Sequence, residues 1–227
     1  MFIGGIQKIS LVDYPGVIAS TIFTKGCNFR CGYCHNPDLL FGKVEQIPAD
    51  EVLAYLKDSK GKKIDGVCIC GGEPTIHSDL PDFIKKIKEM GLKVKLDTNG
   101  SHPEVLKKCE VDYVAMDVKT SFDRYHEICW IKNIEGKIKE SIDYLIDQNK
   151  FDYEFRTTLV PELVGPEELK AIGLKLKDSK RWFLQNFSNK KTLDPSFEKL
   201  NPYSQEIGEG WVADLRNLGC NSVSLRD

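Results

Sequence analysis

Short runs rich in β-branched and aromatic residues alternate along this chain with longer segments that show the apolar periodicity of a helix. Repeated strand–helix–strand units form a parallel sheet that is covered by helices. The predicted strands are residues 17–24, 66–70, 93–97, 113–118, 153–159 and 182–185, with a short further run at 222–225. The predicted helices are residues 48–57, 78–90, 134–146, 166–177 and 204–218.

The number of these units limits the architecture. Six strand–helix units in 227 residues are fewer than the eight of a closed barrel, which typically needs about 250 residues. We therefore predict an α/β fold, a partial, open (β/α)6-type TIM barrel with parallel strands that forms one domain over residues 1–227. A doubly wound open sheet is the alternative. In both folds, functional residues belong at the C-terminal ends of the strands.

Charge and hydropathy exclude several classes of protein. The formal net charge is −2 and no cluster of lysine and arginine stands out, so nucleic acid is not expected as a partner. No apolar run reaches the roughly 18 residues of a membrane helix, and the first residues do not resemble a signal peptide. We therefore expect a cytoplasmic protein that does not bind membranes.

Eight cysteines are many for a chain expected in a reducing compartment, where thiols serve metals or catalysis rather than disulfides. Cys27, Cys31 and Cys34 have the spacing C-x3-C-x2-C and lie in a segment, residues 25–47, without a clear strand or helix. Connections of this length are usually functional. The other five are expected to pack as small apolar side chains: Cys68, Cys70, Cys109, Cys129 and Cys220.

Three thiolates on one loop are compatible with more than one metal centre. Four-iron clusters usually have four thiolate ligands, so three cysteines would leave one iron open to a substrate or cofactor. A zinc ion with His35 as the fourth ligand is the next interpretation, although the adjacent Cys34 and His35 are awkward partners on one tetrahedron. Three buried thiols without a metal are the third interpretation.

Polar motifs end the next three predicted strands. They are Gly71-Gly72-Glu73-Pro74, Asp97-Thr98-Asn99-Gly100 and Asp117-Val118-Lys119. Each also has a simpler interpretation, as a turn or as solvated charges at a strand end. Asp117 and Lys119 are two residues apart, so their side chains share one face if the strand continues.

The cysteine spacing, with Tyr33 before the last cysteine, resembles the signature of the radical S-adenosylmethionine family. The resemblance implies one [4Fe-4S] cluster held by Cys27, Cys31 and Cys34, with S-adenosylmethionine chelated by the open iron. It also implies an oxidoreductase that cleaves this cofactor reductively to a 5′-deoxyadenosyl radical. The implied cofactor-binding residues are Tyr33, Gly71, Gly72, Glu73, Pro74, Asp97, Asp117, Lys119 and Arg156.

The resemblance also implies roles for individual groups. Glu73 and the carbonyls of its turn would receive the amino group of the cofactor's methionine. Asp117 and Lys119 would contact the ribose and the methionine carboxylate. Asp97 and Asp117 would line a site for a monovalent cation.

Two more motifs, Asp13-Tyr14-Pro15-Gly16 and Cys34-His35-Asn36-Pro37, resemble those of the activating enzymes of glycyl-radical enzymes. The similarity is greatest to the branch that serves anaerobic ribonucleoside-triphosphate reductase. It implies anaerobic function, a partner enzyme whose glycine loses a hydrogen atom, and a flavodoxin or ferredoxin as electron donor. The chain departs from the pattern at Ile18, where the subfamily often has arginine.

Two other functions stay open at the level of the sequence. One is a radical enzyme that acts on a small molecule, such as 7-carboxy-7-deazaguanine synthase, and the other is a non-catalytic module that binds structural zinc. The three histidines outside the cysteine loop are expected to be solvated and receive no role: His77, His102 and His126.

Overall fold

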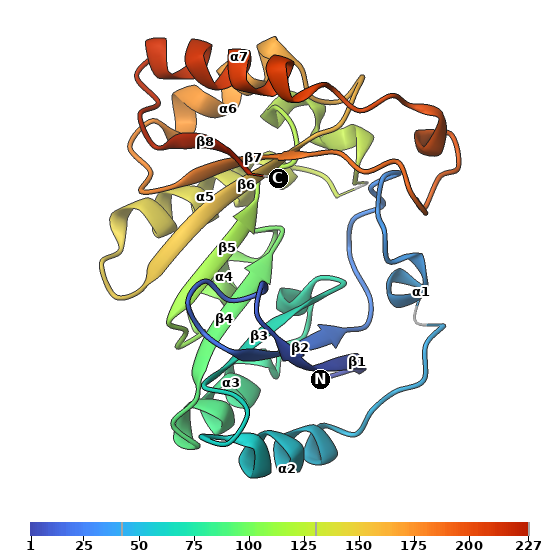
Figure 1. Ribbon diagram of the computed structural model, residues 1–227, viewed down its shortest axis with the longest axis vertical. Coiled ribbons are helices and arrows are strands. Elements are labelled where there is room, and N and C mark those ends of the chain that lie inside the picture. The colour runs from blue at the N-terminus through green and yellow to red at the C-terminus, as the bar shows by residue number, and fades with distance from the viewer. Residues whose placement is uncertain (42, 130, 227) are drawn as a thin grey trace. The chain divides into compact units, whose positions relative to one another are not determined.

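The computed structural model describes residues 1–41, 43–129 and 131–226 (Figure 1). Its strands follow one another in a single eight-stranded sheet, in the order β1-β2-β3-β4-β5-β6-β7-β8. The strands are β1 (Ile3–Ser10), β2 (Ala19–Thr24), β3 (Gly66–Gly71), β4 (Lys93–Thr98), β5 (Tyr113–Asp117), β6 (Asp152–Leu159), β7 (Trp182–Asn186) and β8 (Val223–Arg226).

The helices connect these strands in the predicted alternation. They are α1 (Pro37–Leu40), α2 (Ala49–Ser59), α3 (Leu80–Glu89), α4 (Pro103–Leu106), α5 (Ile134–Asp147), α6 (Pro166–Leu176) and α7 (Gln205–Asn217). Short 3-10 turns are η1 (Pro74–Ile76), η2 (Phe122–Glu127) and η3 (Phe197–Lys199). The strand pairs β2–β3, β3–β4, β6–β7 and β7–β8 are parallel, and the predicted open α/β barrel is confirmed.

The first strand is the exception to the parallel order. β1 pairs with β2 antiparallel, although no strand was predicted there. Its sequence, IGGIQKIS, contains two glycines, which are depleted in strands and hide the pattern. Gly4 has a packing reason, because a Cβ atom at this position would meet side-chain atoms of Leu39, Lys25 and Val44 at 2.6–2.7 Å. The strand therefore packs against residues on both sides of the cysteine motif.

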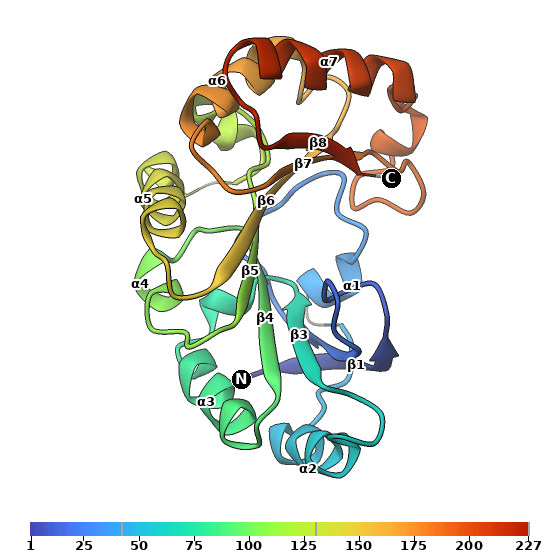
Figure 2. The same ribbon diagram turned by 60° about the vertical axis from the view of Figure 1, so that its left-hand side comes forward.

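The chain divides into two compact units. Unit 1 comprises Met1–Asn28, Asn36–Ala115 and Asn149–Asp152. In Figure 2, α2 and α3 lie on the outer side of β3 and β4. The apolar stripe of α3 is fully or almost fully buried, as are the facing β3 and β4 side chains: Leu80, Phe83, Ile84, Ile87, Val67, Ile69, Val94 and Leu96. Each such side chain stabilises the fold by about 1.5–3 kcal/mol.

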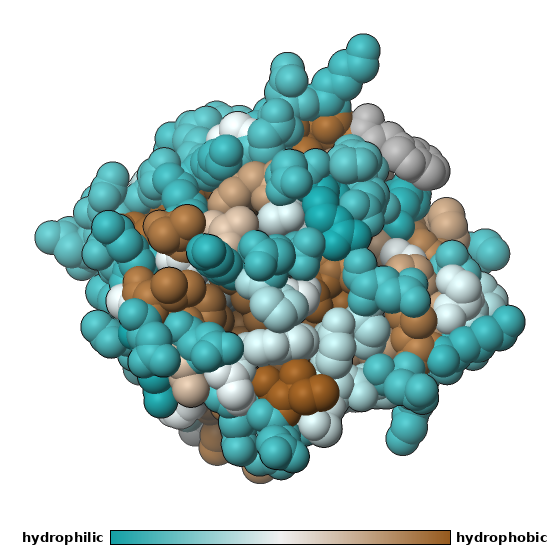
Figure 3. Space-filling model, turned by 90° about the horizontal axis from the view of Figure 1, so that it is seen from above, coloured by the Kyte–Doolittle hydropathy of each residue, from teal (hydrophilic) through white to brown (hydrophobic). Residues whose placement is uncertain are grey.

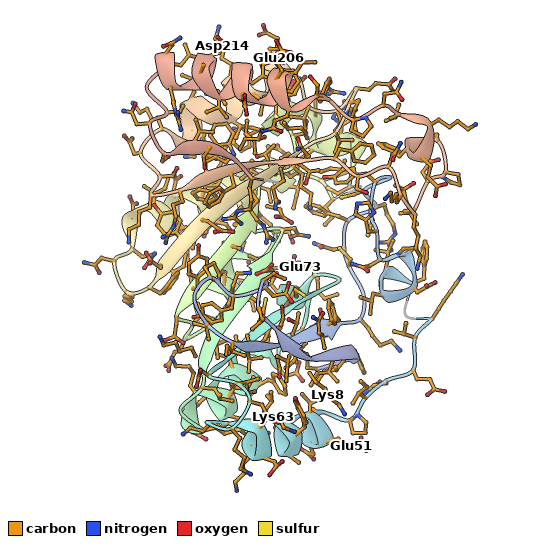
Figure 4. The ribbon with its side chains drawn as sticks, viewed as in Figure 1. Lys8, Glu51, Lys63, Glu73, Glu206 and Asp214 are labelled. Carbon is orange, nitrogen blue, oxygen red and sulfur yellow. The ribbon has the colours of Figure 1, made fainter. Side chains whose placement is uncertain are left out.

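Unit 2 comprises Phe29–His35, Met116–Gln148 and Tyr153–Asp227. Its core includes Trp182, which is fully buried and donates a 3.0 Å hydrogen bond from Nε1 to Oγ1 of Thr157. Glu206 and Asp214 lie on the outer side of α7 (Figure 4), and hydrophilic side chains dominate the face seen in Figure 3. None of the described helices is long and apolar enough to cross a membrane. That residues 1–227 form a single domain stays a prediction.

Candidate functional site

The cysteine motif lies where the chain passes from one unit to the other. Cys27 belongs to unit 1, whereas Cys31 and Cys34 belong to unit 2. None of the three forms a disulfide; Cys31 is buried and the other two are half-buried. Within the described part of either unit, no three histidine, cysteine or acidic side chains are gathered as they would be around a single metal ion.

In unit 1, the turn after β3 is pressed against the residue that precedes Cys27. The backbone N–H of Glu73 donates a 2.9 Å hydrogen bond to the carbonyl of Gly26. A Cβ atom on Gly72 would lie 1.8 Å from that carbonyl oxygen, so only glycine allows this approach. Gly71 has a φ of +112°, which side chains disfavour. The two glycines of the predicted motif therefore set the position of the start of the cysteine loop.

The Glu73 carboxylate is buried and fully engaged by unit 1 (Figure 4). It accepts hydrogen bonds from the backbone N–H of Thr75 at 3.0 Å and of Asn99 at 2.6 Å, and from the hydroxyls of Thr75 and Thr98. Burial raises the pKa of Glu73, and these donors counteract the rise. Glu73 thus ties the turns after β3 and β4 together, and its predicted contact with the cofactor's amino group stays a prediction.

The turn after β4 also holds the cysteine loop. Nδ2 of Asn28, the residue after Cys27, donates a 2.8 Å hydrogen bond to the Ser101 hydroxyl. Nδ2 of Asn99 donates one of 3.0 Å to the Asn28 side-chain oxygen. These bonds fix the beginning of the loop to the motif Asp97-Thr98-Asn99-Gly100.

In unit 2, Asp117 lies between two cationic side chains. Nε of Arg156 is 2.8 Å from one carboxylate oxygen, and Nζ of Lys119 is 3.2 Å from the other. Burial alone would raise the pKa of Asp117, but the charges of Arg156 and Lys119 hold it at about 2. The structure therefore brings three predicted cofactor-binding residues together, from the end of β5, the residues just after it, and the interior of β6.

Lys119 connects this cluster to the cysteine motif. Its Nζ lies 5.8 Å from the centroid of the Tyr33 ring. Burial by itself would lower the pKa of Lys119, but Tyr33, Asp117 and Cys31 raise it well above the ordinary value, so the ammonium stays charged. Burial raises the pKa of the Cys31 thiol, and the charge of Lys119 opposes that rise.

The connection between β7 and α7, residues 187–203, packs on the second half of the cysteine loop, and we call it the strap. The backbone N–H of Asp194 donates a 2.9 Å hydrogen bond to the carbonyl of Gly32. Nδ1 of His35 lies 3.0 Å from the carbonyl oxygen of Lys190. The Phe197 ring covers Gly32, where a Cβ atom would meet it at 2.3 Å, and it also contacts Tyr33.

Three further observations concern residues named in the sequence analysis. Asp97, at the start of the motif after β4, forms an ion pair with the buried Lys95 on its own strand, and its binding of a cofactor or cation stays a prediction. His77 was expected to be solvated, and this was wrong: the side chain is buried and its Nε2 lies 3.0 Å from the carbonyl oxygen of Lys25. Burial lowers the pKa of His77. Of the five cysteines outside the loop, Cys70 is half-buried and four are buried: Cys68, Cys109, Cys129 and Cys220.

Sequence reasoning missed five residues that hold the site. Thr75, Thr98 and Asn99 donate hydrogen bonds to Glu73, and Asn28 is bonded to Asn99. Their positions within or beside the motifs were the signal that the sequence offered. Phe197 gave no such signal, because it is 163 positions after Cys34.

Comparison with known proteins identifies the family of this chain. The model of the Radical SAM superfamily matches residues 21–171. A Methanocaldococcus jannaschii protein named as a glycyl-radical enzyme activating enzyme is 36% identical over 225 residues, covering 96% of this chain and 90% of the relative. The pyruvate formate-lyase-activating enzyme of Clostridium pasteurianum is 36% identical over 180 residues, covering 73% of this chain and 71% of the relative.

A solved structure supports the fold. Streptococcus suis SuiB, in the structure bound to precursor peptide SuiA, superposes with a TM-score of 0.69 at 15% identity, covering 91% of this chain and 48% of that chain. The match to residues 21–171 includes all three cysteines of the motif and the turns after β3, β4 and β5. The chain belongs to the radical SAM superfamily, and its sequence is similar to those of glycyl-radical enzyme activating enzymes.

Proposed function

We propose that this chain is an activating enzyme that installs a radical on a glycine of a partner glycyl-radical enzyme. When bound, a [4Fe-4S] cluster and S-adenosylmethionine would supply a 5′-deoxyadenosyl radical, which removes a hydrogen atom from the glycine Cα. The observation that carries the proposal is the three-thiol loop held by the motif turns after β3 and β4. Family membership and the two activating-enzyme relatives support it.

The residues present fit an iron–sulfur cluster. Cys27, Cys31 and Cys34 form no disulfide, and iron–sulfur clusters are held by cysteine thiolates. The close approach of Gly72 to Gly26 and the hydrogen bonds of Asn28 order the loop around the first thiol. The strap orders the part around the other two. We propose that all three thiolates bind one cluster and that one iron is left open for the cofactor.

The charged groups of Asp117, Lys119 and Arg156 fit the polar parts of the cofactor. Lys119 is held charged, so it can pair with the methionine carboxylate. Asp117 is ionised over the whole physiological range and can accept hydrogen bonds from ribose hydroxyls. Arg156 fixes the Asp117 carboxylate through its 2.8 Å contact. Tyr33 supplies an aromatic face beside Lys119.

We also propose a specific partner enzyme and electron donor. The motifs around Asp13 and His35 favour anaerobic ribonucleoside-triphosphate reductase as the glycyl-radical enzyme, with a flavodoxin or ferredoxin as electron donor. Cytoplasmic, anaerobic function is part of the same proposal. Because a protein loop is the substrate, the enzyme must leave room for a peptide.

The first test is anaerobic reconstitution with iron and sulfide, followed by measurement of 5′-deoxyadenosine released from S-adenosylmethionine under reducing conditions. We expect wild-type protein to release it and the variants Cys27→Ala, Cys31→Ala and Cys34→Ala to lose it. Cys220→Ala is the matched control, because that thiol is buried far along the chain against Gly173. Cleavage that survives any of the three loop substitutions would contradict the proposed ligand set.

The second test identifies the radical's destination. Reconstituted protein is mixed with a candidate anaerobic ribonucleotide reductase, and the glycyl radical is detected by EPR spectroscopy. Cofactor cleavage without a glycyl signal in any candidate partner would count against the activating function. Turnover of carboxy-tetrahydropterin would then favour the small-molecule alternative. Zinc without iron in anaerobically purified protein would favour the non-catalytic alternative.

A further inference from the structure

We infer that the Lys95 ammonium, which is paired with Asp97, takes the place of the monovalent cation implied by the family resemblance. The inference deepens the proposed function and rests on it for the location of Asp97 beside the cofactor. The residues present do not fit an additional cation, and three observations support this.

The first observation is the pairing within β4. Lys95 and Asp97 are two residues apart, so both side chains lie on one face of the strand. Nζ of Lys95 forms an ion pair with Oδ1 of Asp97. The Lys95 side chain is only 4% exposed and that of Asp97 17%. A buried ammonium has to be paired, which makes this a durable contact rather than a surface ion pair.

The second observation is the lining around the pair. Cys68 on β3 is in register with Lys95, and its Sγ lies 3.7 Å from both the lysine Nζ and the Asp97 Oδ1. Cys68 offers the pair only a thiol, which is a weak donor and acceptor, and not a carboxylate. The side of the pair that faces β3 therefore adds no negative charge that a second cation would need.

The third observation concerns the other carboxylate of the expected cation site. Asp117, in unit 2, contacts Arg156 at 2.8 Å and Lys119 at 3.2 Å. Each of the two carboxylates thus has a protein cation as its partner. A free cation that approached either carboxylate would meet the repulsion of a like charge within a few ångströms.

The test compares thermal unfolding midpoints of the full chain, with and without a reconstituted cluster, in potassium, sodium and choline chloride at equal concentration. For wild-type protein we expect the same midpoint in all three salts, within about 1 °C. Lys95→Met removes the ammonium that pairs with Asp97. We expect this variant to have a lower midpoint in choline chloride and to regain about 2–4 °C in potassium or sodium chloride.

Two variants serve as controls. Lys93→Met makes the same change at an exposed position on the same strand, and its midpoint should not depend on the cation. Lys95→Arg keeps the charge and should stay insensitive like the wild type. For reconstituted protein, cofactor cleavage by the wild type should be equal in the three salts, whereas cleavage by Lys95→Met should require potassium or sodium.

Two outcomes would overturn the inference. One is a potassium-dependent rise in the wild-type midpoint that is lost in Asp97→Asn. The other is a Lys95→Met protein that folds but shows no dependence on the cation. If Lys95→Met does not fold, the comparison of wild type with Asp97→Asn still decides. The midpoints of cluster-free protein do not depend on catalysis, so an absence of cofactor cleavage would refute the proposed function separately.

Discussion

The backbone N–H of Asn99 donates a 2.6 Å hydrogen bond to the buried carboxylate of Glu73. This contact joins the turns that follow β3 and β4, two neighbouring parallel strands. Asn99 is also hydrogen-bonded to Asn28, the residue after Cys27. A substitution at Glu73 should therefore change the position of Cys27. Glu73 is therefore expected to act on the site through the backbone as well as through any contact with a cofactor.

The substitution Glu73→Gln tests this coupling. It replaces one acceptor oxygen with a donor, so at least one of the N–H or hydroxyl groups now bonded to Glu73 loses its acceptor. Leaving such a buried group unpaired costs about 1–3 kcal/mol, which chemical denaturation can measure. Glu110→Gln, at an exposed position, should change stability by less than about 0.5 kcal/mol.

The same variant should change the pH dependence of stability. The pKa of Glu73 is raised in the folded state, so the folded protein holds this proton more tightly than the unfolded chain. The contribution of Glu73 to stability is fully present below its pKa in the unfolded chain, near 4.5, and is lost as the pH rises through its pKa in the folded protein. The stability difference between wild type and Glu73→Gln should therefore shrink with rising pH, and a difference that grows would contradict the assignment.

Gly72→Ala should break the approach of the turn to the cysteine loop. The new Cβ would lie 1.8 Å from the backbone oxygen of Gly26, and a backbone atom cannot rotate away as a side chain can. We expect reconstituted protein to hold much less iron and sulfide and to lose cofactor cleavage. Gly5→Ala is a suitable control, because its Cβ would meet Phe23 at an ordinary 3.7 Å. Iron content equal to that of the wild type in Gly72→Ala would refute the role of this contact.

The elements with a strong local period were predicted closely from the sequence. The strand predicted over residues 93–97 is β4 (Lys93–Thr98), and the helix predicted over 134–146 is α5 (Ile134–Asp147). In these two elements the spacing of the apolar residues indicates both the type of secondary structure and where it begins and ends. β1 was missed because its two glycines interrupt the strand pattern; the close approach of Leu39 excludes a side chain at Gly4, whereas Gly5 has room for one.

The candidate site was predictable as motifs but not as a set of contacts. The motif residues at the strand ends follow from the topology, because parallel strands bring their C-terminal ends to one edge. The buried state of His77 depends on which segments the tertiary structure places over it. The pair of Lys95 and Asp97 is local, because residues two apart share one face of β4, and it was not predicted. The strap is the clearest case, since Phe197 and Gly32 are far apart in the chain and neither carries a motif that links them.

The contact between Phe197 and Gly32 can be tested by a double-mutant cycle. Gly32→Ala places a Cβ 2.3 Å from the Phe197 ring, which must move or displace the loop. We expect this variant to lose stability and to react faster with alkylating reagents at Cys31 and Cys34 in cluster-free protein. In the background of Phe197→Ala the same change should cost less, with a coupling of about 0.5–3 kcal/mol.

Gly136→Ala is the matched control for this cycle. Gly136 lies in α5, no atom would be within 4 Å of its new Cβ, and alanine is the better helix former. The variant should be more stable than wild type by about 0.5–1 kcal/mol. Equal costs of Gly32→Ala with and without the Phe197 ring would show that the strap does not hold the cysteine loop.

The ion pairs of Asp117 predict an acid-dependent loss of stability. The pKa of Asp117 is lowered from 3.8 to about 2, so its contribution is present above the unfolded value and is lost as the pH falls through about 2. The shift corresponds to a stabilisation of about 2 kcal/mol at neutral pH.

Asp117→Asn should remove this stabilisation, and it removes the negative charge that pairs with Lys119 and Arg156. Its stability should therefore depend less on pH between about 4 and 2 than that of wild type. Asp178→Asn, at an exposed position in unit 2, should keep the wild-type profile. Urea unfolding at a series of pH values measures both, and parallel acid profiles of wild type and Asp117→Asn would mean that Arg156 and Lys119 do not hold this carboxylate ionised.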